Sequence, residues 1–279
     1  MKKSISYWMF PGNWSLEQIV KTTKDAGYDA IELSYDETGP LSLSGTKEEV
    51  LKVKETVEQA GLEIAALATG LFWTYSLTAD DPDTRQKAKE IVKGMLQTAK
   101  WLGTDAILVV PGAVDVFFNP NSDVVPYDVA WERSMAALKE LAPVAEELQV
   151  TIGIENVWNK FLLSPLEMAR FIDEINSPYV GAYFDVGNVL FAGYPQDWIR
   201  ILGERIKRVH IKDFRKSVGT VDGFVALLEG DVPWPEVIKA LREISYDGYV
   251  TAEILPPYKY DGAQLAYDTC AAMEKIFKL

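Results

Sequence analysis

The chain of 279 residues contains one cysteine, Cys270, and one histidine, His210. A single cysteine excludes an intramolecular disulfide and any zinc site built from several cysteines, and it is typical of a reducing compartment. Basic residues are also scarce: the chain has 28 lysines and arginines and 41 aspartates and glutamates, which gives a formal net charge of −13. Since this charge repels polyanions and the basic residues are not segregated, we expect no nucleic-acid partner.

Long apolar runs are missing as well. Lys2 and Lys3 precede only a short apolar run, which ends at Pro11. The sequence therefore supports neither a secretory signal nor a membrane span. With 48% hydrophobic and 25% charged residues, the composition is that of an ordinary soluble enzyme. We expect a cytoplasmic protein without a membrane partner.

A helix-then-strand unit repeats along the chain. At Gly27, Gly61 and Gly103 an amphipathic pattern stops at glycine, and an apolar strand begins within a few residues. Glycine readily adopts the left-handed conformation that closes a helix. The helix before Gly27 has Ser15 as its predicted N-cap, with Gln18 in the capping-box position. Helical spacing recurs in a further set that we expect to be core: Ile91, Val92, Met95, Leu96 and Ala99.

Eight strands are predicted, at residues 5–10, 30–35, 63–69, 106–111, 151–156, 180–186, 206–213 and 249–254. Nearly continuous apolar strands separated by helices indicate a parallel sheet covered by helices. Eight such units predict a single-domain (β/α)8 TIM barrel over residues 1–279. An open doubly wound sheet is the alternative, but no Gly-x-Gly-x-x-Gly motif follows the first strand.

Residues suited to metal binding stand at the ends of the last four predicted strands: Glu155, Asp185, His210 and Glu253. A lone histidine is more often a hydrogen-bonded structural residue than a ligand, so the three carboxylates decide the interpretation. A buried unpaired carboxylate is costly, and three at corresponding strand ends are better explained by a shared ion than by independent salt bridges. Three oxygen ligands and one imidazole favour a divalent cation, Mn²⁺ ahead of Mg²⁺, Co²⁺ or Zn²⁺.

The motifs around these residues resemble one superfamily. The runs are IENVWN at 154–159, FDVGN at 184–188, VHIKD at 209–213 and AE at 252–253. They resemble the ketose 3-epimerases and the sugar-phosphate isomerases or epimerases of the xylose isomerase-like superfamily. The resemblance implies that Glu155, Asp185, His210 and Glu253 hold one divalent metal ion. Many relatives carry histidine two or three residues beyond the sixth-strand aspartate, where this chain has Asn188.

The activity that this resemblance implies is epimerisation or isomerisation of a ketose or ketose phosphate. Such a reaction begins with removal of a proton from the carbon next to a carbonyl, and a metal on the neighbouring oxygens stabilises the enediolate. Glu155 and Glu253, on separated strands, are the predicted acid–base pair for opposite faces of that carbon. A base acting on one face would instead interconvert an aldose and a ketose, and the sequence leaves both outcomes open.

Other functions remain as alternatives. An inosose-type dehydratase and a hydroxypyruvate isomerase are the nearest enzymes of the same superfamily, and a non-catalytic, metal-stabilised sugar-binding protein is the alternative from another class. Abasic-site endonucleases share the architecture but need several histidines around a zinc cluster, which this chain lacks.

Substrate contacts are predicted in the loops that follow the strands. Trp14 and Trp158 lie just beyond strand ends, where rings can stack on sugar carbons, although aromatic packing is the default for each. Asn188 is expected to hydrogen-bond the substrate. Trp73 is a third aromatic candidate, and Glu32 ends the second strand as another pocket acid.

A basic group follows the seventh strand and consists of Lys212, Arg215 and Lys216. By resemblance, Arg215 contacts substrate hydroxyls, for which its guanidinium fork is suited, and Lys212 is a further substrate contact. The same charge favours a phosphorylated ketose, with a neutral sugar as the alternative and a solvated loop as the explanation without function. Asp213 is expected to orient a ligand or to pair with Arg215.

A long connection at residues 113–126 contains Phe117 and Phe118 beside Asn119. Aromatic residues in a polar loop predict a lid or a homo-oligomer contact, with local packing as the alternative.

Overall fold

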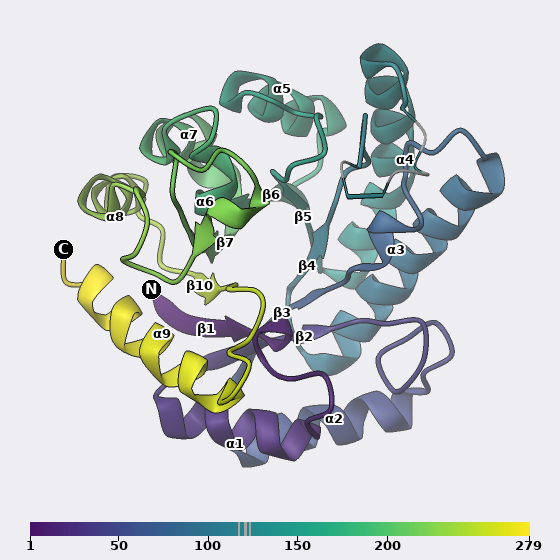
Figure 1. Ribbon diagram of the computed structural model, residues 1–279. Coiled ribbons are helices and arrows are strands. Elements are labelled where there is room, and N and C mark those ends of the chain that lie inside the picture. Colours follow the sequence, from purple (N-terminus) through teal and green to yellow (C-terminus); the bar gives the residue numbers. More distant parts are fainter. Residues whose placement is uncertain (117, 120–121, 123) are drawn as a thin grey trace.

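Eight parallel strands form a closed barrel surrounded by helices (Figure 1). The computed structural model describes residues 1–116, 118–119, 122 and 124–279. In this described part of the chain, the strands follow the order β1-β10-β7-β6-β5-β4-β3-β2 around the barrel. The first and last strands, β1 (Lys2–Ser6) and β10 (Tyr249–Ala252), pair and close the sheet. The structure confirms the predicted (β/α)8 barrel.

The remaining barrel strands are β2 (Ala30–Ser34), β3 (Glu63–Ala68), β4 (Ala106–Val109), β5 (Thr151–Glu155), β6 (Val180–Asp185) and β7 (Ile206–Ile211). The helices are α1 (Leu16–Ala26), α2 (Lys47–Gln59), α3 (Pro82–Leu102), α4 (Tyr127–Leu148), α5 (Pro165–Ile175), α6 (Val186–Val189), α7 (Pro195–Leu202), α8 (Trp234–Glu243) and α9 (Gly262–Ile276).

The helix boundaries follow the predicted signals. Ser15 and Gln18 form a reciprocal capping box at the start of α1, and the helix ends at Gly27 in the left-handed conformation with φ 96°. Gly103 closes α3 in the same way with φ 83°. The apolar stripe predicted on α3 is fully buried.

The predicted first strand, residues 5–10, is wrong in its position. The strand β1 runs from Lys2 to Ser6, and the chain then turns into the 3-10 helix η1 (Tyr7–Met9). The Ser6 hydroxyl accepts a hydrogen bond from the backbone N–H of Trp8, which favours this turn over further extension. The apolar pattern misled the prediction because Met9 and Phe10 are buried in the core rather than in the sheet.

A hairpin inside the loop after β7 was not predicted. The strands β8 (Asp213–Phe214) and β9 (Phe224–Val225) pair antiparallel. Each has only two residues, which is too short for a periodic pattern to reveal.

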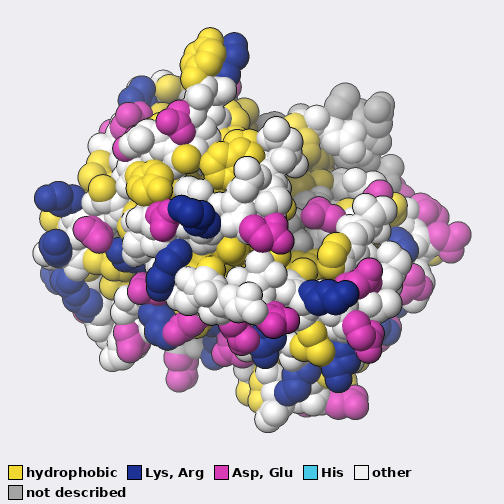
Figure 2. Space-filling model, turned by 90° about the horizontal axis from the view of Figure 1, so that it is seen from below, with side chains coloured by type: hydrophobic (Ala, Val, Ile, Leu, Met, Phe, Trp, Pro, Cys, Tyr) yellow, Lys and Arg dark blue, Asp and Glu magenta, His cyan; other side chains and the backbone are white. Residues whose placement is uncertain are grey.

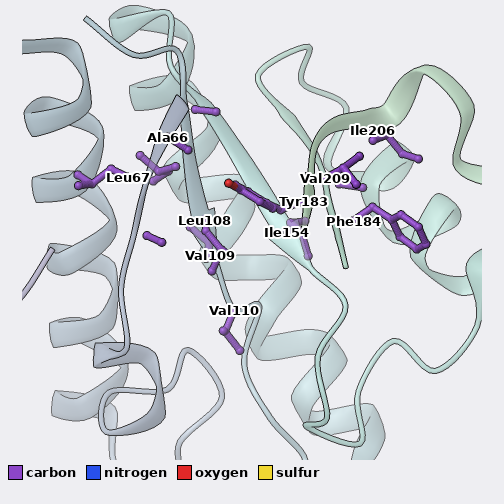
Figure 3. Packing of buried hydrophobic residues seen from close by; sticks show 14 of the residues in the cluster. Ala66, Leu67, Leu108, Val109, Val110, Ile154, Tyr183, Phe184, Ile206 and Val209 are labelled. Carbon is purple, nitrogen blue, oxygen red and sulfur yellow. The ribbon is translucent and has the colours of Figure 1, made fainter. Parts of the chain in front are cut away.

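The core lies on both sides of the sheet (Figure 3). Tyr183 and Phe184 point to opposite sides of β6, and both are fully buried. Burying a side chain such as Phe184 stabilises the fold by about 1.5–3 kcal/mol. Because alternate residues of a strand face inward, the barrel interior receives a polar set at the carboxyl end of the same strands.

Charge is mixed on the face of the molecule shown in Figure 2, where acidic and basic side chains are interspersed. Within the described residues, every helix is too short or too polar to cross a membrane.

Candidate active site at the carboxyl end of the barrel

The four predicted metal ligands converge. Glu155 ends β5, Asp185 ends β6, His210 lies on β7, and Glu253 directly follows β10. One ligand atom from each lies within 4.8 Å of all the others, and all four residues are buried. The parallel register accounts for part of this convergence, because it aligns His210 with Asp185 on one side and with Thr251 on the other. We call these four residues the carboxylate–histidine cluster.

Glu32, predicted as a pocket acid, is the hydrogen-bond partner of His210. The Glu32 Oε2 atom accepts from His210 Nε2 at 2.9 Å, and the same oxygen accepts from the hydroxyl of Tyr183. All three side chains are buried. This arrangement fixes the imidazole ring and turns its Nδ1 atom toward the cluster, 3.8 Å from Glu253 Oε2 and 4.0 Å from Asp185 Oδ2.

Two buried atoms of the cluster test whether a metal ion fits. Among the described residues, His210 Nδ1 has no hydrogen-bond partner, and Asp185 Oδ2 accepts no hydrogen bond but forms an ion pair with the Lys212 ammonium at 2.9 Å. Buried polar atoms are normally satisfied, and a ligating histidine usually donates its other N–H to a carboxylate, as His210 does to Glu32. A divalent ion would satisfy both atoms, so the residues present fit such an ion.

Lys212, predicted to bind substrate, lies at the edge of the cluster. Its Nζ atom donates to Glu253 Oε2 at 2.6 Å and forms an ion pair with Asp185 Oδ2 at 2.9 Å. The side chain is 14% exposed, and its ammonium lies 5.2 Å from the centre of the Phe224 ring. A Cβ atom at Gly187 would lie 2.5 Å from Lys212 Cγ, so the absence of a side chain there gives the lysine stem its path.

The pKa values of the two glutamates, Glu155 and Glu253, are shifted in opposite directions. Burial and the charge of Glu253 raise the pKa of Glu155 to about 8, against the opposing effect of Lys212 and His210. Burial also acts to raise the pKa of Glu253, but Lys212 and His210 outweigh it, so that pKa lies below its ordinary value. Near neutral pH, Glu155 is therefore protonated and Glu253 ionised in the metal-free site.

Histidine protonation follows the same charges. Burial alone lowers the pKa of His210, but Glu32, Glu253 and Glu155 raise it to about 10. An imidazolium at this position neutralises part of the carboxylate charge.

The sequence matches the family described as xylose isomerase-like TIM barrel over residues 20–276. The chain belongs to this family.

Relatives of this xylose isomerase-like barrel include sugar epimerases. The chain is 25% identical over 266 residues to the D-psicose 3-epimerase of Enterocloster bolteae. The match covers 93% of this chain and 82% of the relative. It is also 24% identical over 240 residues to the L-ribulose-5-phosphate 3-epimerase of Salmonella paratyphi A. That match covers 85% of this chain and 81% of the relative.

Solved structures show the same fold. A crystal structure of D-psicose 3-epimerase in the presence of D-fructose superposes with a TM-score of 0.80 at 19% identity, covering 99% of this chain and 98% of that chain. The 3-keto-D-glucoside 4-epimerase of E. coli superposes with a TM-score of 0.78 at 17% identity, with full coverage of both chains.

Asn156 is a site residue that was not predicted from the sequence. Its amide nitrogen donates to the carbonyl of Asp185 at 2.8 Å, and its amide oxygen accepts from the N–H of Asp185 at 2.9 Å. These two bonds fix the end of β6 against the end of β5. The signal was present, since an amide side chain directly follows the strand-end glutamate Glu155.

Asn188 and Trp158, predicted to bind substrate, extend this network. The Asn188 side chain donates to the carbonyl of Asn156 at 3.0 Å, and the Trp158 indole donates to the carbonyl of Asn188 at 2.9 Å. These residues line a pocket of about 310 Å³. A second pocket, of about 230 Å³, is lined by Glu253 and Lys212 and by five apolar residues: Val221, Phe224, Val225, Ile254 and Leu255.

Trp14 and Arg215 lie outside the cluster. The Trp14 ring packs against Phe10 with 5.9 Å between ring centres. The Arg215 guanidinium donates to the carbonyl of Glu229 at 3.1 Å and lies 3.5 Å from the Glu229 carboxylate. Arg215 directly follows β8 in the β8–β9 hairpin, and this position accounts for its contact with Glu229 instead of the cluster.

The expectation that Asp213 orients a ligand or pairs with Arg215 is corrected by its contacts. Its carboxylate accepts hydrogen bonds from the backbone N–H groups of Phe214, Leu228 and Val232 and from the Trp234 indole. Asp213 therefore organises the loop that leads to α8.

The aromatic loop at residues 113–126 is described in part. Phe118, predicted to belong to a lid or an oligomer contact, packs edge-on against Trp73, predicted to stack on a sugar, with 5.1 Å between ring centres. Each ring thus has a packing partner within the chain. Phe117 lies outside the described residues.

Replacing Glu32 with glutamine is expected to weaken Mn²⁺ binding about 10- to 100-fold, because a neutral amide no longer raises the basicity of the His210 ligand. Isothermal titration calorimetry with Mn²⁺ measures the effect. Glu37→Gln, at an exposed position shortly after the same strand, is the matched control. Equal Mn²⁺ affinity in Glu32→Gln and in the unmodified protein would show that Glu32 does not support the metal site.

Proposed function

We propose that this protein is a divalent-metal-dependent ketose 3-epimerase. The observation that carries the proposal is the placement of Glu155 and Glu253 in one buried cluster, on strands separated by β6 and β7. Membership of the xylose isomerase-like family and relatives named as ketose 3-epimerases support it.

The ion would be held by Glu155, Asp185, Glu253 and the Nδ1 atom of His210. Mn²⁺ is the proposed native metal, because three carboxylates and one imidazole suit it. When bound, the ion would supply an electrophile that stabilises the negative charge developing on the ketose oxygens.

The two glutamates carry the protons. Glu253, the ionised carboxylate, accepts the proton from the substrate carbon beside the carbonyl. Glu155 passes a proton from solvent to the opposite face of that carbon, because binding of the ion displaces the proton that Glu155 carries in the metal-free site. The carbon keeps its connectivity and inverts its configuration. In the reverse direction the two residues exchange roles, because both directions pass through the same transition states.

We further propose that the substrate extends across both pockets, with Glu253 and Lys212 lining one of them and Asn188 and Trp158 lining the other. Lys212 and Asn188 would contact its oxygens, and Trp158 would contact its carbon face. Trp14 and Arg215 remain proposed contacts at the rim, which they reach if the substrate extends beyond the two pockets.

Proton NMR of a ketose panel in D₂O with Mn²⁺ tests the function directly. A 3-epimerase gives a product of inverted configuration and incorporates deuterium at the carbon beside the carbonyl. Loss of water from the substrate would instead identify a dehydratase, and interconversion of hydroxypyruvate would identify that isomerase. Sugar binding with neither exchange nor turnover would identify a binding protein.

A neutral ketose is the better substrate of the two classes that the sequence left open. Lys212 is engaged by Glu253 and Asp185, and Arg215 by Glu229, so two of the three basic residues are already paired with carboxylates. We expect kcat/KM for a ketose to equal or exceed that for its phosphate ester, and Lys216→Ala to change neither value by more than about twofold. A phosphate advantage of tenfold or more that disappears in Lys216→Ala would overturn this choice.

A further inference from the structure

Lys212 contacts carboxylate oxygens of two members of the carboxylate–histidine cluster. Its ammonium lies 2.6 Å from Glu253 Oε2 and 2.9 Å from Asp185 Oδ2. These two oxygens are also the ones that face the Nδ1 atom of His210, at 3.8 and 4.0 Å. The ammonium and the proposed ion thus share two ligand atoms.

We propose that Lys212 is an internal competitor of the divalent ion. It pairs with Asp185 and Glu253 in the metal-free protein and keeps the affinity for the ion lower than the carboxylates alone would give. The inference rests on the metal site of the proposed function and adds a residue that regulates it.

The repulsion between the two cations supplies the physical reason. Like charges a few ångströms apart repel strongly where water is excluded, and the cluster is buried. The ammonium of Lys212 lies on both shared oxygens, so it opposes the ion unless it moves away from them.

The position of the lysine is specified by its surroundings. Gly187 leaves the space through which the stem passes, and the Phe224 ring faces the ammonium. Phe224 also lines the 230 Å³ pocket together with Lys212. An ammonium that moves away from the shared oxygens has this pocket to enter, where it would meet the substrate.

Calorimetric titration with Mn²⁺ tests the inference, and turnover is not the readout because Lys212 also faces the substrate pocket. We expect Lys212→Met to bind Mn²⁺ at least tenfold more tightly than the unmodified protein. Its metal-free form should unfold at a lower temperature, and saturating Mn²⁺ should close that gap. Lys239→Met, which removes an exposed lysine on α8, is the matched control and should change neither value.

Lys212→Gln provides a second test if the methionine variant does not fold, since glutamine keeps a hydrogen-bond donor for Glu253 without the charge. It should show the same tighter binding. Equal or weaker Mn²⁺ binding by the folded variants would overturn the inference and leave the metal site standing. If the unmodified protein does not bind Mn²⁺, the proposed metal site and the inference fail together.

Discussion

Glu155→Gln and Glu253→Gln should each lower kcat about 10²- to 10⁴-fold on the best ketose of the panel, the range that a general acid or base contributes. Glutamine keeps the size of the side chain but neither accepts nor donates the transferred proton. Glu155→Gln leaves the ionised Glu253 in place, so the substrate should still exchange its proton with D₂O while forming little product. Glu253→Gln should abolish both exchange and product formation in this direction.

The measurement needs two controls, because both residues are also proposed metal ligands. Turnover is measured at saturating Mn²⁺ with the bound metal quantified, and circular dichroism checks the fold. Glu243→Gln, at an exposed position on α8, removes a carboxylate of the same type outside the site. Turnover within about threefold of the unmodified protein in either active-site variant would refute the two-residue scheme.

The sequence predicted the cluster well because each member has a local signal. A carboxylate at the end of an apolar strand interrupts a pattern built for burial, and parallel strands bring such ends to one rim of the barrel. Glu155, Asp185 and Glu253 all follow this rule, and the register of β6 and β7 aligns Asp185 with His210.

The supporting contacts have no local signal. Glu32 and His210 are 178 positions apart in the chain, and Glu32 and Tyr183 are 151 apart. Their pairing depends on closure of the barrel, which places β2 across the interior from β6 and β7. A single sequence contains no information on such a pair beyond the presence of the acid.

The position of Lys212 could have been predicted in part from the sequence. The interpretation of residues 212–216 as one basic group treated three side chains alike. Strand alternation would have separated them, because Lys212 is two positions after the inward-facing His210 and so faces the same side. Arg215 lies beyond the start of the β8–β9 hairpin, where the alternation of β7 no longer applies.

Removing the divalent ion with a chelator should reduce epimerisation to the background rate, and adding Mn²⁺ should restore it. Without the ion, the reaction loses its electrophile, since within the described part of the chain Lys212 and His210 are already paired with carboxylates. Undiminished turnover of a sample shown to be free of metal would contradict the proposed function.

The same reloading experiment should show that Mn²⁺ affinity depends on pH. The pKa of Glu155 is about 8 and that of His210 about 10, both above their ordinary values, so below pH 8 both residues carry protons that the ion must displace. Affinity should therefore rise with pH, by up to about 100-fold per pH unit below pH 8 and up to about tenfold per unit between pH 8 and 10. Calorimetry in buffers of different ionisation enthalpy counts the protons released. An affinity that is constant from pH 6 to 8 would show that the ion does not bind through these two residues.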